Sequence, residues 1–151
     1  MKRRKFIGLG ISAVAVAAMQ TISKADLLKE LPKAFADKKA NSALKDLYGS
    51  STLNKSDKVK LKVPDIAENG GAVPITVSTT IPNPKTMSVF IEGNPRPLAV
   101  AWEIQEGTLP EFSTRVKMRK TSKVILVVED TNGKIYSTTK QVKVTVGGCG
   151  G

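Results

Sequence analysis

The side chain best suited to covalent chemistry is the thiol of Cys149, the only cysteine among 151 residues. A single cysteine cannot form a disulfide within its own chain, so its thiol is buried and inert, bridged to another chain, or reactive. Cys149 lies in the run Gly147-Gly148-Cys149-Gly150-Gly151, beyond the last stretch of alternating apolar residues. This setting argues against a core cysteine and favours a thiol that is presented for reaction.

The glycines around Cys149 predict a slender, flexible arm over residues 147–151, because glycine adds no bulk and accepts backbone angles that other residues avoid. Five fully extended residues reach at most roughly 17 Å. A thiol on such an arm stays attached to its protein while it moves from one enzyme's pocket to the next. The sequence therefore predicts a covalent carrier and not an enzyme, with Cys149 as the attachment point. Its carrier segment consists of Cys149 with Gly147, Gly148, Gly150 and Gly151.

The absence of histidine limits the other chemistry open to this chain. No Ser-His or Cys-His pair is available to activate a nucleophile, and zinc sites built from cysteine and histidine are excluded. The carboxylates, among them Asp65, Glu68 and Asp130, show no spacing that assigns acid and base roles. We therefore predict no catalytic residue, no metal site and no cofactor.

Other interpretations of the terminal cysteine remain open from the residues alone. A thiol oxidoreductase would need a second cysteine from another subunit. A structural or adhesive module would dimerise through a Cys149–Cys149 disulfide. A thiocarboxylate carrier would use the end Gly150-Gly151, although such carriers end in bare Gly-Gly and are not exported. A frayed chain end without function is the remaining alternative.

The first 25 residues have the pattern of an export signal. A basic run at residues 2–5 precedes an uncharged stretch over residues 6–22, and residues 23–25 offer a small-residue cleavage site. The pair Arg3-Arg4 directly before an apolar stretch resembles the twin-arginine signal. The alternative is a retained membrane anchor, for which roughly 17 residues is the lower limit. The prediction is export to the periplasm, with no membrane contact after cleavage.

The formal charge of +11 overstates the basic character of the exported protein. The first 25 residues hold five of the 24 basic residues and none of the 13 acidic ones, which leaves 19 against 13, or +6. No basic motif interleaved with aromatic residues is present, and an exported protein rarely meets nucleic acid. We therefore expect no nucleic-acid partner.

Two short helices are predicted before the period of the apolar residues changes. Apolar residues recur at helical spacing from residue 26 to about 39, where Pro32 is expected to break or kink the helix. A second helical pattern over residues 43–48 ends at Gly49.

After Asp57 the apolar residues alternate with polar ones, which is typical of strands. Asn132-Gly133 is the clearest hairpin signal. Seven or eight short strands without helices between them predict a mainly β protein, an immunoglobulin-like antiparallel β-sandwich with a closed barrel as the alternative. With the helices, this domain covers residues 26–146. The candidate strands are residues 58–63, 73–80, 86–92, 98–104, 112–119, 123–129, 134–139 and 141–146.

In one predicted strand, cationic residues alternate with apolar ones. Arg115, Lys117 and Arg119 alternate with Val116 and Met118, so the cations are predicted to face one way and the apolar side chains the other. Such a row of cations is either an ordinary solvated face or a surface that steers acidic partners.

The Gly-Gly-Cys-Gly-Gly run, the twin-arginine-like start and the β-rich body together resemble the SoxY family, the sulfur carriers of periplasmic thiosulfate oxidation. The resemblance also rests on residues 66–70, 73–75 and 81–84 and covers the whole exported chain. It implies that Cys149 is the carrier cysteine and that the glycines form a swinging arm. It further implies a heterodimer with SoxZ and transient visits to SoxXA, to SoxB and, in some systems, to SoxCD.

Overall fold

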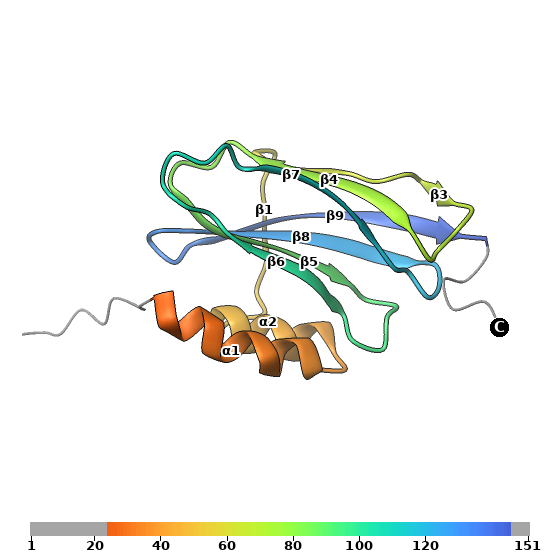
Figure 1. The fold of residues 1–151 in the computed structure, drawn as a ribbon, viewed down its shortest axis with the longest axis horizontal. Coiled ribbons are helices and arrows are strands. Elements are labelled where there is room, and N and C mark those ends of the chain that lie inside the picture. Colours follow the sequence, from red (N-terminus) through yellow and green to blue (C-terminus); the bar gives the residue numbers. More distant parts are fainter. Residues whose placement is uncertain (1–23, 146–151) are drawn as a thin grey trace, which may run out of the picture.

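The computed structural model describes residues 24–145, with side chains from residue 30 onward. These residues form three layers, in which a small sheet lies on a larger one and two helices cover the opposite face of the larger sheet (Figure 1). The elements are α1 (Lys24–Ala36), α2 (Ala40–Tyr48), β1 (Asn54–Lys55), β2 (Val59–Lys62), β3 (Ile66–Ala67), β4 (Val73–Thr79), β5 (Pro84–Ile91), β6 (Leu98–Glu103), β7 (Glu111–Val116), β8 (Ser122–Asp130) and β9 (Ile135–Val144).

The two sheets differ in size and in strand direction. The larger sheet has the order β1-β9-β8-β5-β6, with β3 also paired to β9, and the smaller has the order β2-β4-β7. The β5, β6, β8 and β9 pairings are antiparallel, whereas β1 and β3 run parallel to β9. The predicted mainly β sandwich with short N-terminal helices is confirmed, and over the described residues the sheets stay open instead of closing into a barrel.

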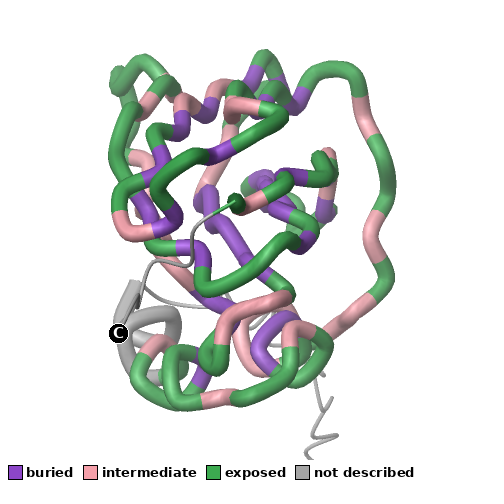
Figure 2. The backbone as a smooth tube through the Cα atoms, turned by 90° about the vertical axis from the view of Figure 1, so that its right-hand side faces the viewer, coloured by how far each residue is buried: buried purple, intermediate pink, exposed green. Residues whose placement is uncertain are grey.

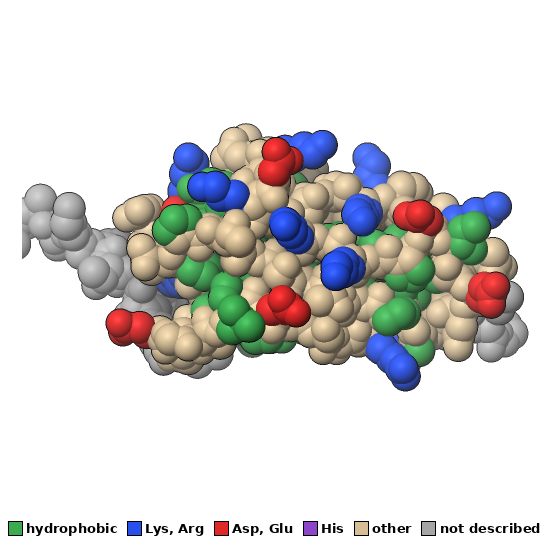
Figure 3. Space-filling view, turned by 90° about the horizontal axis from the view of Figure 1, so that it is seen from above, with side chains coloured by type: hydrophobic (Ala, Val, Ile, Leu, Met, Phe, Trp, Pro, Cys, Tyr) green, Lys and Arg blue, Asp and Glu red, His purple; other side chains and the backbone are tan. Residues whose placement is uncertain are grey.

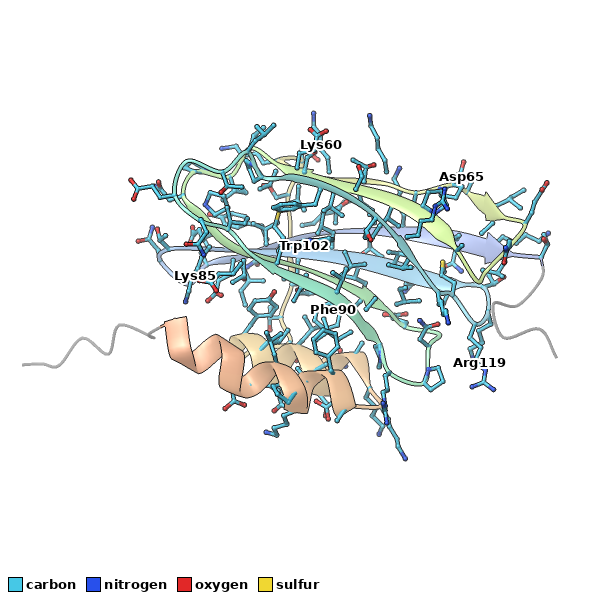
Figure 4. The ribbon with its side chains drawn as sticks, viewed as in Figure 1. Lys60, Asp65, Lys85, Phe90, Trp102 and Arg119 are labelled. Carbon is cyan, nitrogen blue, oxygen red and sulfur yellow. The ribbon has the colours of Figure 1, made fainter. Side chains whose placement is uncertain are left out.

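The core lies on both faces of the larger sheet (Figure 2). In β2, Val59 and Leu61 are buried between the sheets while Lys60 and Lys62 are exposed, as the alternation predicts. The central strands β5 and β8 are buried almost throughout, because the helices cover the face that the small sheet does not. Phe90 accordingly points from β5 toward the helices (Figure 4). Each fully buried aliphatic or aromatic side chain contributes about 1.5–3 kcal/mol.

Gly49 and the pair Asn132-Gly133 form a helix end and a hairpin turn at the positions that the sequence predicts. Gly49 ends α2 with a positive φ of 69°, and its N–H donates to the Lys45 carbonyl at 2.8 Å. Gly133 has φ 79° in the β8–β9 turn. There the Asp130 carboxylate accepts hydrogen bonds from the N–H groups of Asn132 and Lys134, each at 2.9 Å. The Asn132-Gly133 hairpin is therefore confirmed.

Two predicted details are wrong. Pro32 does not break the first helix, because α1 continues past this exposed residue to Ala36. The two strands predicted around Lys140 are one strand, β9, because β8 continues to pair with it there. The short strands β1 and β3 were not predicted. No helix in the described part of the chain is long and apolar enough to cross a membrane.

Candidate functional site

The predicted site residues follow the last strand of the fold. Cys149 and the glycines Gly147, Gly148, Gly150 and Gly151 lie outside the described residues, as do Arg3 and Arg4. The structure instead describes where the carrier segment begins. β9 ends at Val144, and Thr145 is the last described residue. We call this end of the sandwich, at the tip of the β9 arrow in Figure 1, the arm end.

The end of β9, the last strand before the carrier segment, is hydrogen-bonded on both of its edges. On one edge β8 pairs with it as far as Ser122 opposite Val142. On the other edge the Lys143 N–H donates to the Asp65 carbonyl at 2.9 Å, and the Thr145 N–H donates to the Ala67 carbonyl at 3.1 Å. The main chain is therefore fixed by hydrogen bonds up to Thr145.

A third segment, the β7–β8 connection, also binds the end of β9. The Val144 N–H donates to Thr121 Oγ1 at 2.9 Å, and the Thr121 hydroxyl lies 3.4 Å from the Val144 carbonyl oxygen. We call residues 117–121 the cationic loop, because they contain Lys117, Arg119 and Lys120 and no acidic residue.

The cationic loop is itself bonded to two further segments. The Met118 N–H donates to the Gly70 carbonyl at 2.7 Å, and the Met118 side chain is fully buried. The Asn94 side chain donates to the Lys117 carbonyl at 2.7 Å and accepts from the Arg119 N–H at 2.9 Å. Four segments distant in the sequence thus meet at the base of the carrier segment.

Glycine is required at one of these meeting points. A Cβ on Gly93 would lie 2.7 Å from Ser122 Cβ and 2.8 Å from Ser122 Oγ. Ser122 is buried and opens β8, so it has little room to shift. The close approach of the β5–β6 turn to β8 therefore depends on the missing side chain.

The predicted alternation of charge in β7 is confirmed by burial. Val116 and Met118 are buried, whereas Arg115, Lys117 and Arg119 are exposed, although the strand itself ends at Val116. Cationic side chains outnumber acidic ones on the face seen in Figure 3. Arg119 extends from the arm end in Figure 4.

Acidic residues lie on the opposite side of the arm end, beside β3. Asp65 and Glu68 are exposed there, and Ile66 between them is 56 % exposed. A groove of about 370 Å³ runs along this side, lined by residues that include Pro64, Ile66 and Ala72. β9 therefore ends between the cationic loop and a side where Asp65 and Glu68 lie beside apolar surface and the exposed Lys143.

A second polar cluster lies between the helices and the larger sheet. The Tyr48 hydroxyl is hydrogen-bonded to Ser88, and burial raises the pKa of Tyr48 to about 12. Burial also raises the pKa of Glu129, which accepts a 3.4 Å hydrogen bond from Thr86. The bond between Tyr48 and Ser88 fastens α2 to the sheet, whereas that between Thr86 and Glu129 joins β5 to β8. Among the described residues no group of three His, Cys, Asp or Glu side chains is placed to hold a metal.

Sequence reasoning missed the bonds that fix the base of the carrier segment. Thr121 and Asn94 have no feature that distinguishes them from other loop residues, and their partners are 23 to 25 residues away. The conspicuous signal, the cysteine among glycines, marks the segment but not what supports it.

Comparisons with known proteins agree with the resemblance found in the sequence. The family model for the sulfur oxidation protein SoxY matches residues 44–149, which reaches Cys149. The solved sulfur carrier protein SoxY from Chlorobium limicola f thiosulfatophilum is 36 % identical, with a TM-score of 0.64, and the match covers 78 % of this chain and 99 % of that one. No curated protein matches the chain.

Two superoxide reductases share the fold alone. The neelaredoxin from Ignicoccus hospitalis is 11 % identical, with a TM-score of 0.53, over 61 % of this chain and 94 % of that one. The putative superoxide reductase from Thermotoga maritima is 18 % identical, with a TM-score of 0.52, over 61 % and 93 %. The family match, by contrast, spans most of the chain and includes its sole thiol. The chain belongs to the SoxY family of sulfur oxidation proteins.

Proposed function

We propose that this protein is a sulfur carrier of thiosulfate oxidation, which holds the sulfur intermediates covalently on Cys149. The observation that carries the proposal is the family match, which extends to the only thiol of the chain. The domain division predicted from the sequence belongs to the same proposal, with an export signal over residues 1–25, a folded domain over residues 26–146 and a carrier segment over residues 147–151.

The chemistry assigned to the thiol requires partner enzymes. Joining thiosulfate to Cys149 forms a sulfur–sulfur bond and releases one proton and two electrons, so the loading enzyme, which we propose is SoxXA, must pass electrons to an acceptor. Hydrolysis by SoxB would then add water to the terminal sulfonate, release sulfate and leave a persulfide on Cys149. In some systems SoxCD would oxidise the outer sulfur of that persulfide to a sulfonate, with oxygen from water, and would pass the electrons to an acceptor. The carrier itself supplies the nucleophilic sulfur and no catalytic group.

The fixed base of the carrier segment supports a swinging-arm mechanism. Cys149 is the fourth residue after Thr145, which allows a reach of at most about 14 Å. Because β9 is held up to Thr145, the thiol searches a small volume in front of the arm end. The effective concentration of the thiol at an enzyme docked there is correspondingly high.

Export and assembly complete the proposal. The protein would enter the periplasm through the twin-arginine signal and pair with SoxZ, which lacks an arm. The twin-arginine route transports folded proteins, so a bound partner without its own signal would cross with it. Replacing Arg3 and Arg4 by Lys should leave both proteins in the cytoplasm, as fractionation would show. Arrival of SoxZ in the periplasm of that strain would contradict the co-export.

A cysteine-relocation experiment tests the carrier function. A strain with Cys149→Ser should lose thiosulfate consumption while the protein remains at its normal level. A second strain combines Cys149→Ser with Thr108→Cys, which places an exposed thiol in the β6–β7 connection. We expect no consumption there either, because the new thiol is not on the arm. Normal consumption in the Cys149→Ser strain would refute the function.

A further inference from the structure

We propose that the cationic loop is a docking surface for an acidic protein surface, the rim of the channel through which a partner enzyme admits the carrier segment. The inference rests on the proposed function and specifies the partner's chemistry. Its basis is the combination of two independent observations, the position of the loop at the base of the carrier segment and the charge of its exposed side chains.

The first observation restricts where a partner has to bind. Cys149 lies at most about 14 Å from Thr145, so an enzyme that acts on the thiol inside a pocket must cover the arm end. The Thr121 side chain of the cationic loop is hydrogen-bonded to Val144, the residue directly before Thr145. Any partner deep enough to enclose the thiol therefore contacts this loop or its immediate surroundings.

The second observation is the unbalanced charge of the loop. Lys117, Arg119 and Lys120 are exposed, and none of them forms an ion pair with another described residue. The β5–β6 turn, whose Asn94 holds the loop, adds two exposed charges of opposite sign, Glu92 and Arg96. Three neighbouring cations on a main chain fixed by hydrogen bonds are unfavourable to one another, and an acidic surface would relieve that repulsion.

The fixed main chain separates this surface from ordinary solvated lysines. Hydrogen bonds with Gly70 and Asn94 hold the backbone of the loop, and the buried Met118 side chain anchors its centre. The Thr121 side chain joins the loop to the Val144 N–H. The cations therefore project from a defined position relative to β9. On the β3 side Asp65 and Glu68 flank Ile66, opposite which lies the exposed Lys143, so an acidic rim is attracted more strongly on the side of the cationic loop. The orientation of the docked enzyme follows from this asymmetry.

Charge reversal provides the test. The variant Lys117→Glu/Arg119→Glu changes the cationic loop, whose hydrogen bonds use main-chain groups at both positions. The matched control Lys55→Glu/Lys58→Glu makes the same change in charge at exposed residues elsewhere. Lys55 pairs with Ser137, seven residues before Val144 along β9 and hence about 23 Å away. Equal thermal unfolding curves would establish that both variants are folded.

The readout is the rate at which purified SoxXA loads Cys149 from thiosulfate with an added electron acceptor. We expect kcat/KM to fall roughly tenfold in the loop variant and less than about twofold in the control, with kcat unchanged. The difference should shrink between about 50 mM and about 300 mM salt, because screening shortens the range of the attraction. Equal rates for the two variants would overturn the inference while leaving the carrier function intact.

A chemical control distinguishes docking from an effect on small anions, such as the cargo itself. The thiol of each variant is reacted with an anionic aromatic disulfide and with a neutral one. We expect the loop variant to react with each reagent less than about twofold more slowly than the wild type does, since neither reagent needs the docking surface. A loss of reactivity toward the anionic reagent as large as the loss toward SoxXA would overturn the inference. Failure of SoxXA to load the wild-type protein would instead refute the proposed function.

Discussion

Two connections carry the chain between the sheets at opposite ends of the sandwich, and they are built differently. The β6–β7 connection, residues 104–110, exposes 76 % of Leu109 and contains Gly107 at φ 79°. At its two ends the Ile104 N–H donates to the Lys85 carbonyl at 2.9 Å and the Pro110 carbonyl accepts from the Thr79 N–H at 3.2 Å. Between these ends the Thr108 N–H donates to the Gln105 carbonyl at 3.1 Å. The β7–β8 connection is of similar length, yet it buries Met118 and bonds to three other segments.

This difference shows that the long-range hydrogen bonds concentrate in the β7–β8 connection. Both connections join the same pair of sheets, so crossing between sheets alone does not require the bonds made by residues 117–121. The additional bonds occur at the end from which the carrier segment starts. We interpret them as the means by which a stable sandwich gives a short arm a fixed origin.

The largest expected difference concerns the apolar side chain of each connection. Met118→Ala should lower the free energy of unfolding by about 2–4 kcal/mol, because it opens a cavity at a fully buried position. Leu109→Ala should change it by less than about 0.5 kcal/mol, since that side chain is exposed. Urea unfolding of both variants measures the contrast. Equal losses would show that the two connections are equivalent.

The glycines of the two ends provide the next comparison. Gly93→Ala should destabilise by about 1–3 kcal/mol, because the new Cβ meets buried Ser122. Gly107→Ala has open space around it and should cost about 1 kcal/mol, from its positive φ alone. Thermal unfolding would rank the two variants. A Gly93→Ala protein as stable as the wild type would mean that the arm end is not tightly packed.

A smaller and more local effect is expected at the base of the carrier segment. Thr121→Val removes the acceptor of the Val144 N–H and should cost about 1 kcal/mol. Hydrogen exchange at Val144 should accelerate, while exchange in the centre of β8 should be unaffected. Thr108→Val, at the other end, serves as the control. Unchanged exchange at Val144 would show that Thr121 does not hold the end of β9.

The smallest expected effect is a pH dependence of the free energy of unfolding, which comes from the buried Glu129. This residue lies near the β8–β9 turn, away from the arm end. Burial raises its pKa above the ordinary value of 4.5, so the folded state keeps the proton to a higher pH than the unfolded state does. Its contribution is fully present below pH 4.5 and is lost as pH rises through the raised pKa. Glu129→Gln should remove this decline in the free energy of unfolding. An identical pH profile for variant and wild type would contradict the assignment.

Much of the sandwich was predictable, because alternation reports burial directly. Val59 and Leu61 against Lys60 and Lys62 predicted β2, and Asn132-Gly133 predicted the hairpin. The continuous apolar runs of β5 and β8 were predicted as strands too, but the prediction failed where polar residues follow one another. The prediction separated strands over residues 134–139 and 141–146 at the polar Lys140, although the main-chain pairing with β8 continues through it.

The site was predictable only in part for a related reason. A lone cysteine among glycines is visible in the sequence, and the family comparison extends to it. The support of its segment depends on tertiary contacts, as between Thr121 and Val144 or Asn94 and Arg119, that no local pattern encodes. The two-residue strand β3 is likewise too short for any period to indicate.

The central claim is that Cys149 carries the sulfur cargo, and intact-mass spectrometry tests it most directly. The protein would be isolated from thiosulfate-grown cells and measured with and without reductant, beside the Cys149→Ser variant. We predict added masses that match sulfur, sulfonate or thiosulfonate groups, that are lost with reductant where the adduct is joined through a sulfur–sulfur bond, and that are absent from the variant. A bare thiol, or only a homodimer linked through Cys149, would contradict the claim and favour a structural module.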